Sequence, residues 1–130
     1  MANDLEIKKN DVIIKSSANN NLSDVIKPLV KEIHLFDTFI AGTSYIEKEL
    51  LERLKVDDKL TLQRENNKYD AKAILVLNGD KQKIGYIPEE DNIIFSRLMD
   101  AGKLLTAKIE SINIKGDWYK VRIKIYLMDI

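Results

Sequence analysis

Cysteine is absent from this chain of 130 residues, and histidine and tryptophan occur once each. Without cysteine there are no disulfides, no thiolate metal ligands and no cysteine nucleophile. The single histidine, His34, has no second histidine with which to share a metal ion, so we expect it to be structural. The five glycines are scattered and form no Walker or dinucleotide-binding loop. We therefore predict no catalytic residues, no metal, no cofactor and no enzymatic activity.

Long apolar segments are also missing. The apolar runs are far shorter than the roughly 18 residues that a membrane-spanning helix needs. Residues 1–9 lack a basic region followed by a long apolar stretch, so no secretion signal is predicted. These absences favour a cytoplasmic protein with no membrane partner. A chain of this length suits one domain with one core and is too short for a helicase motor.

Neither sign of charge predominates, because the chain has 21 basic and 21 acidic residues. Strong sequence-independent binding of duplex DNA usually requires a basic surface, and this balance argues against it. The distribution is nevertheless uneven. Residues 103–124 contain six basic side chains, and their only acids are Glu110 and Asp117. A local excess of this kind is sufficient to attract the few phosphates at the end of a strand.

Alternating apolar and polar residues predict a mainly β domain. The strands are expected at residues 36–42, 59–64, 73–77, 83–87, 104–114 and 118–128. The last two form a hairpin with its turn at 115–117. One face of the last strand contains Tyr119, Val121, Ile123, Ile125 and Leu127.

Two helices are predicted between these strands. Residues 45–54 have apolar positions at helical spacing, and Ser44 with Glu47 forms a capping box at the start. Pro88 opens the second helix in its first turn, where the three acids that follow suit the helix dipole. Gly102 ends this helix as a C-terminal cap.

The N-terminal part of the chain is polar. We interpret residues 1–20 as an extension with a short β-like run at 12–14, and residues 21–130 as the domain itself. Residues 23–32 have the features of a short helix that packs on the domain, although Pro28 is awkward within it.

The most informative segment is residues 62–74, where polar turn residues separate two strands. Asn67 and Asp70 are ordinary turn formers, because their side chains bond to nearby backbone. Tyr69 is less ordinary there. It either anchors the loop to the core or offers a flat face to a planar ligand such as a nucleobase. Arg64 either contacts a partner or holds the loop, by bonding to its carbonyls or pairing with Asp70.

This segment, together with Phe39–Tyr45 before it and Ile84–Pro88 after it, resembles the HIRAN domain family in order and spacing. The resemblance covers roughly residues 36–127. It implies a small six-stranded β-barrel related to OB and SH3-like barrels, with two or three short helices. The best understood members bind single-stranded DNA at a free 3′ end and are often fused to helicase-type enzymes. Small bacterial proteins with little more than this domain also exist, and this chain resembles those.

The resemblance also implies a site and a function. Tyr69 would stack on or brace the terminal nucleotide, Asp70 would accept a hydrogen bond from its 3′-hydroxyl, and Tyr45 would stack on a neighbouring base. The implied role is capture of single-stranded DNA ends in DNA repair or replication-fork processing, with a helicase or nuclease as candidate partner. The candidate DNA-binding residues are Ser44, Tyr45, Arg64, Asn67, Lys68, Tyr69, Asp70, Lys72 and Trp118.

The chain departs from the family pattern at three points. Ser44, Tyr45 and Ile46 stand where DNA-end-binding members can carry an arginine and two tyrosines, so that arginine is missing. Lys68 replaces a proline and Lys72 replaces an asparagine. The missing arginine and the zero net charge favour a rival function, in which the groove binds a peptide or a partner subunit. Binding of RNA or mixed single strands is the second alternative.

Overall fold

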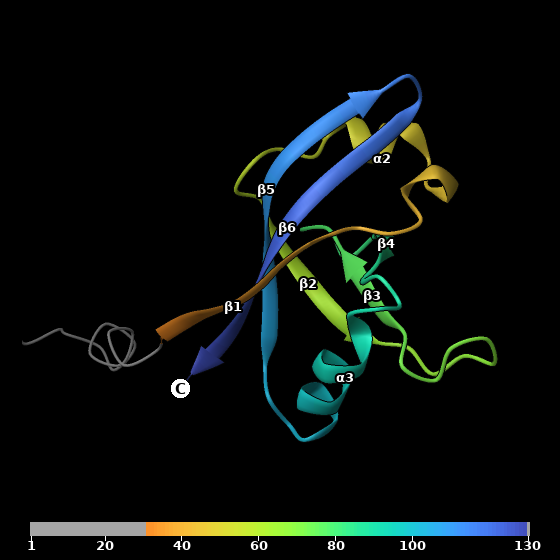
Figure 1. Cartoon of the computed structure of the whole chain (residues 1–130). Coiled ribbons are helices and arrows are strands. Elements are labelled where there is room, and N and C mark those ends of the chain that lie inside the picture. Colours follow the sequence, from red (N-terminus) through yellow and green to blue (C-terminus); the bar gives the residue numbers. More distant parts are fainter. Residues whose placement is uncertain (1–30, 130) are drawn as a thin grey trace, which may run out of the picture. The chain divides into compact units, whose positions relative to one another are not determined.

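A computed structural model of the chain describes residues 31–129. They form one six-stranded sheet with two α-helices and one 3-10 helix (Figure 1). The elements are β1 (Lys31–Phe39), η2 (Thr43–Tyr45), α2 (Lys48–Glu52), β2 (Lys59–Arg64), β3 (Ile74–Leu77), β4 (Lys83–Tyr86), α3 (Asn92–Asp100), β5 (Leu105–Lys115) and β6 (Trp118–Asp129). No helix in this part of the chain is both long enough and apolar enough to cross a membrane.

The strands follow the order β1-β6-β5-β2-β3-β4 across the sheet. The two outer strands, β1 and β4, meet through a single bridge beyond the end of β1. There the Ala41 N–H donates to the Tyr86 carbonyl over 2.8 Å, and the Tyr86 N–H donates to the Ala41 carbonyl over 2.9 Å. The sheet is therefore not closed by continuous pairing but curls into a barrel-like fold. The prediction of a mainly β, barrel-like domain is confirmed.

The core lies inside this curled sheet. The alternation of β6 is confirmed, because Tyr119, Val121, Ile123 and Ile125 are buried while the residues between them are not. The helical segments contribute Leu51 and Phe95 to the same cluster. Burying these apolar side chains is the main favourable term in the stability of such a domain.

The helix predicted at residues 45–54 is wrong in its extent. Thr43–Tyr45 form the 3-10 helix η2, Ile46 is extended, and α2 begins only at Lys48. The buried Thr43 hydroxyl donates to the Tyr119 carbonyl over 2.8 Å and attaches η2 separately to β6. The capping box of Ser44 with Glu47 is wrong for the same reason, because it needs a helix that continues between them.

The second helix begins later than predicted. Pro88 lies in a turn, closed by the Asp91 N–H donating to its carbonyl, and α3 starts at Asn92. The Asp91 carboxylate does not cap α3; it accepts a hydrogen bond of 2.7 Å from the Thr38 hydroxyl on β1. The predicted end at Gly102 is confirmed. Gly102 has a φ of +91°, and its N–H donates to the Met99 carbonyl as in a Schellman motif.

The remaining differences are small. β1 begins at Lys31 rather than 36, so Lys31 and Glu32 are not the end of a helix. The expectations for residues 1–30, including the strand at 12–14 and the rest of the helix at 23–32, lie outside the described residues. A bulge at Glu110 interrupts the alternation of β5, which the sequence pattern did not indicate. Beyond the bulge, apolar residues of β5 again lie opposite core residues of β6, as Ile112 does opposite Val121.

Gly85 makes the bridge between β1 and β4 possible. A Cβ atom on Gly85 would lie 2.3 Å from Ile40 Cγ2 and 2.5 Å from the Ala41 carbonyl oxygen. Its φ of +151° is also one that other residues rarely adopt. The glycine of the Ile84–Pro88 motif is thus explained by the close approach of the two outer strands.

Candidate nucleic-acid interface

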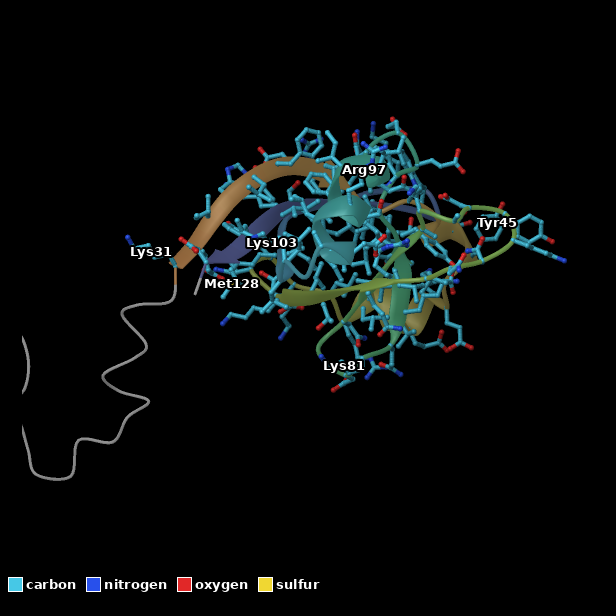
Figure 2. All side chains as sticks on the ribbon, turned by 90° about the horizontal axis from the view of Figure 1, so that it is seen from below. Lys31, Tyr45, Lys81, Arg97, Lys103 and Met128 are labelled. Carbon is cyan, nitrogen blue, oxygen red and sulfur yellow. The ribbon has the colours of Figure 1, made fainter. Side chains whose placement is uncertain are left out.

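A groove of about 680 Å³ lies between η2 and α2 on one side and the β2–β3 loop and β4 on the other. Two tyrosines, Tyr45 and Tyr69, contribute to its lining and are 91% and 86% exposed. Figure 2 shows Tyr45 at the opposite end of the domain from Lys103 and Met128. The lining residues are Ala41, Gly42, Tyr45, Ile46, Glu47, Leu50, Asn67, Tyr69, Asp70, Ala73, Lys83, Tyr86, Ile87 and Glu89.

The β2–β3 loop owes its shape to Asn67. The Asn67 Oδ1 accepts hydrogen bonds from the backbone N–H groups of Tyr69 (2.9 Å) and Asp70 (2.7 Å). This is the local bonding for which asparagine is favoured in turns. The turn leaves the Tyr69 ring in solvent, where Lys68 Nζ lies 5.2 Å from the ring centroid. Of the two roles considered for Tyr69, the structure therefore excludes anchoring to the core.

Asp70 is half-buried, and its carboxylate also holds the loop in place. Its Oδ1 accepts the backbone N–H of Lys72 over 2.9 Å, and its Oδ2 accepts a hydrogen bond of 2.8 Å from the Asn92 side-chain amide. Asn92 is the first residue of α3 and is buried. The carboxylate is thus held in one orientation at the wall of the groove.

Arg64 braces this loop and does not line the groove. Its guanidinium donates to the carbonyls of Ala73 (2.7 Å) and Ala71 (2.9 Å). It also forms an ion pair of 2.9 Å with Asp100, not with Asp70. The hydrogen bond from Arg64 lowers the pKa of Asp100 below its usual value. Two roles were considered for Arg64, and the structure shows the second: Arg64 holds the loop.

Tyr86, on β4, forms a polar network in the groove that the sequence analysis did not indicate. Its hydroxyl donates to Glu65 Oε1 over 2.8 Å and accepts a hydrogen bond from Lys83 Nζ over 3.0 Å. Hydrogen bonds from Asn67 and Tyr86 lower the pKa of Glu65 below its usual value. The alternation of β4 does not indicate this contact, because residues 83 and 86 are three positions apart and a regular strand would place them on opposite faces.

The predicted site residues fall into two groups. Tyr45, Asn67, Tyr69 and Asp70 lie together on the groove. The others are not among its lining residues: Ser44 is exposed on η2, Lys68 and Lys72 belong to the β2–β3 loop, Arg64 is bonded to carbonyls of that loop, and Trp118 starts β6.

The groove wall is acidic. Glu47, Asp70 and Glu89 contribute carboxylates, and among residues 31–129 Lys83 is the one basic residue of the lining. Such a wall suits a hydroxyl or a base edge better than a phosphate, since like charges repel. Within residues 31–129, no cluster of three histidine or carboxylate side chains could hold a metal ion.

The HIRAN domain model matches residues 33–128. The chain belongs to the HIRAN domain family. Domains of this family are DNA-binding modules, so membership supports nucleic-acid binding by this chain. It is a binding domain and not a catalytic one, which fits a protein that is not an enzyme.

Two solved structures are similar to this one. A crystal structure of a protein from Lactobacillus plantarum has 25% sequence identity and a TM-score of 0.71, over 78% of this chain and 99% of that chain. The HIRAN domain of human HLTF has 16% identity and a TM-score of 0.63, over 77% of this chain and 79% of that one. The second likeness shows the fold alone. No curated protein sequence matches this chain significantly.

Proposed function

We propose that this chain captures single-stranded DNA at a free 3′-hydroxyl end, in the groove between η2 and the β2–β3 loop. The observation that carries the proposal is the position of two almost fully exposed tyrosines, Tyr45 and Tyr69, on the groove that also contains the fixed Asp70 carboxylate. Exposed aromatic rings are what proteins use to stack nucleobases of single strands, where each stacked base contributes about 1–3 kcal/mol.

Asp70 has the capacity to accept further hydrogen bonds. Each carboxylate oxygen accepts at about two lone-pair sites, and each oxygen of Asp70 uses one for Lys72 or Asn92. A terminal 3′-hydroxyl could donate to one of the remaining sites of this carboxylate. A 3′-phosphate in the same place would meet a fixed negative charge, so the groove would reject it.

The remaining lining residues agree with this arrangement. The acidic wall from Glu47 and Glu89 disfavours phosphates deep in the groove, and a strand end is the part of DNA that can enter without one. Lys83 supplies a cation for the phosphate that joins the last two nucleotides.

Membership of the family supports a proposal for the biological setting. We propose that residues 21–130 form the DNA-end reader and residues 1–20 an extension to it. The domain would act in DNA repair or replication-fork processing, with a helicase or nuclease as its partner at the captured end.

A second candidate function is supported by the same acidic wall. Three carboxylates against one lysine would also suit a cationic peptide. Fluorescence anisotropy with two labelled probes separates the candidates: a short single-stranded oligonucleotide with a free 3′-hydroxyl, and a lysine-rich peptide of similar length. End capture predicts saturable binding of the oligonucleotide that Tyr69→Ala weakens. Binding of the peptide alone would favour the second candidate.

A further inference from the structure

The outward face of β6 carries a row of cations that the groove does not use. Lys120, Arg122 and Lys124 alternate with buried core residues and therefore point to the same side of the sheet. Alternate residues of a strand are about 6.6 Å apart, so these three charges form an evenly spaced line. We call these three residues the β6 ladder.

A second row crosses the β6 ladder at Lys124. The strand register puts Lys59 of β2 opposite Lys108 of β5, and Lys108 opposite Lys124 of β6. Like charges directly opposite on neighbouring strands destabilise a sheet. Glu32 offsets the charge of the middle lysine, Lys108, and an anion lying across the row would offset the repulsion that remains.

Carboxylates on this face offset only part of the charge. Glu32 pairs with Lys108 at 2.9 Å, and Glu110 lies 3.9 Å from Arg122 in a half-exposed contact. No carboxylate among residues 31–129 lies within salt-bridge distance of Lys120 or Lys124. Counted over the described residues, the face therefore keeps a net positive charge, in contrast to the acidic groove.

The β6 ladder begins beside the groove. Trp118, 43% exposed, is the first residue of β6 and shares the outward face with Lys120. The next residue, Tyr119, accepts the hydrogen bond from Thr43 that attaches η2 to β6. Since η2 also carries Tyr45 on the groove, the start of the ladder is joined directly to the groove wall. Figure 1 shows the β5–β6 hairpin extending from this end along the length of the domain.

We propose that the β6 ladder is a second nucleic-acid contact, which binds the phosphates of the strand upstream of its captured end. A strand leaving the groove passes Tyr45 and Trp118 and then follows Lys120, Arg122 and Lys124. This inference extends the proposed function, but it concerns the sugar-phosphate backbone and not the terminal hydroxyl. It explains how a chain of zero net charge and an acidic groove can hold DNA: two faces of opposite charge bind different parts of the strand.

The test compares single-stranded oligonucleotides of about 4 and about 16 nucleotides, which bracket the usual site sizes of OB-type folds. For the wild-type protein, the long oligonucleotide should bind more tightly and with a steeper dependence of log K on log salt. The triple substitution Lys120→Gln, Arg122→Gln and Lys124→Gln should flatten that slope by about 2, since each phosphate contact to a single strand contributes about 0.7. Binding of the short oligonucleotide should change little.

The matched control removes three cations elsewhere, at Lys55, Arg97 and Lys103, and should leave the slope for the long oligonucleotide almost as in wild type. Equal salt slopes for long and short oligonucleotides in the wild-type protein would overturn the proposal, even if the triple variant did not fold. An unchanged slope in a folded triple variant would do the same. Repeating the series with 3′-phosphate ends separates the two proposals. Binding to the β6 ladder should depend on the length of the oligonucleotide, whereas end capture in the groove should depend on its 3′ terminus.

Discussion

The Asp70 carboxylate accepts a hydrogen bond of 2.8 Å from the side-chain amide of Asn92, 22 positions further along the chain. The β2–β3 loop is thereby attached to the first turn of α3, behind the groove. Asn92 is only 2% exposed, so its amide has no ready replacement partner in solvent. Because the same carboxylate is proposed to receive the 3′-hydroxyl, the order of the loop and the binding of DNA depend on one contact.

Asn92→Ala should therefore impair both the stability of the protein and its binding of DNA. Removing the buried amide leaves the Asp70 oxygen without its donor and should lower the free energy of unfolding by about 1–3 kcal/mol. It should also weaken binding of a 3′-hydroxyl oligonucleotide. Urea denaturation and fluorescence anisotropy measure the two effects. Asn66→Ala, at an exposed position of the same loop, is the control and should change stability by less than about 0.5 kcal/mol. A stable Asn92→Ala protein with wild-type binding would contradict the role of the contact.

Gly85→Ala should destabilise the domain strongly. The added Cβ would meet Ile40 and the Ala41 carbonyl at 2.3 and 2.5 Å, so the bridge between β1 and β4 must open. Overpacking of this kind costs about 1–3 kcal/mol, and the backbone strain at positive φ adds to it. The comparison is Gly79→Ala in the β3–β4 turn, where the added Cβ meets nothing within 4 Å. Thermal unfolding should show a large decrease in the melting temperature for Gly85→Ala and almost none for Gly79→Ala.

Arg64→Gln should reduce stability but leave the salt dependence of DNA binding unchanged. The guanidinium donates to two loop carbonyls and pairs with Asp100, so it is occupied within the protein. Losing its bonds to the carbonyls should cost about 1–3 kcal/mol in urea denaturation. A decrease in the salt slope comparable to that expected for a ladder residue would instead show that Arg64 contacts a phosphate.

Stability should fall at acidic pH partly because of Glu65. Hydrogen bonds from Asn67 and Tyr86 make its pKa lower in the folded protein than the usual 4.5. Its contribution to stability is complete above that usual value and is lost as the pH falls through the folded-state pKa. Glu65→Gln should flatten this part of the pH profile in chemical denaturation. Glu90→Gln, at an exposed position outside the network, should retain the wild-type profile. Identical profiles for all three proteins would contradict the assignment.

The strands could be predicted from the sequence because their faces differ so clearly. β2 has the predicted bounds, and the alternation of β6 marks its buried face correctly. The predictions of the helices were less accurate, because the start of each helix depends on contacts with distant strands. Thr43 bonds to β6 and Asp91 bonds to β1, and neither contact leaves a periodic trace in the sequence.

The site was predictable only in part, for the same physical reason. Turn chemistry and resemblance indicated Tyr45, Asn67, Tyr69 and Asp70, which the structure brings onto one groove. The partners of these residues come from elsewhere in the fold. The Asn92 amide behind Asp70 and the Lys83 amine beside Tyr86 become part of the site only when α3 and β4 take their places.

The most direct test of end capture is the ratio of affinities for one short oligonucleotide with a 3′-hydroxyl or a 3′-phosphate, measured by fluorescence anisotropy at fixed, moderate salt. The 3′-hydroxyl form should bind more tightly, and changes at the 5′ end should have little effect. Asp70→Ala should cost about 1.5–3 kcal/mol if the bond forms in a desolvated site, and Tyr69→Ala about 1–3 kcal/mol. Asp70→Asn, which removes the charge but keeps the size, should reduce the discrimination between the two ends. Equal affinity for both ends, unchanged by these substitutions, would contradict the account.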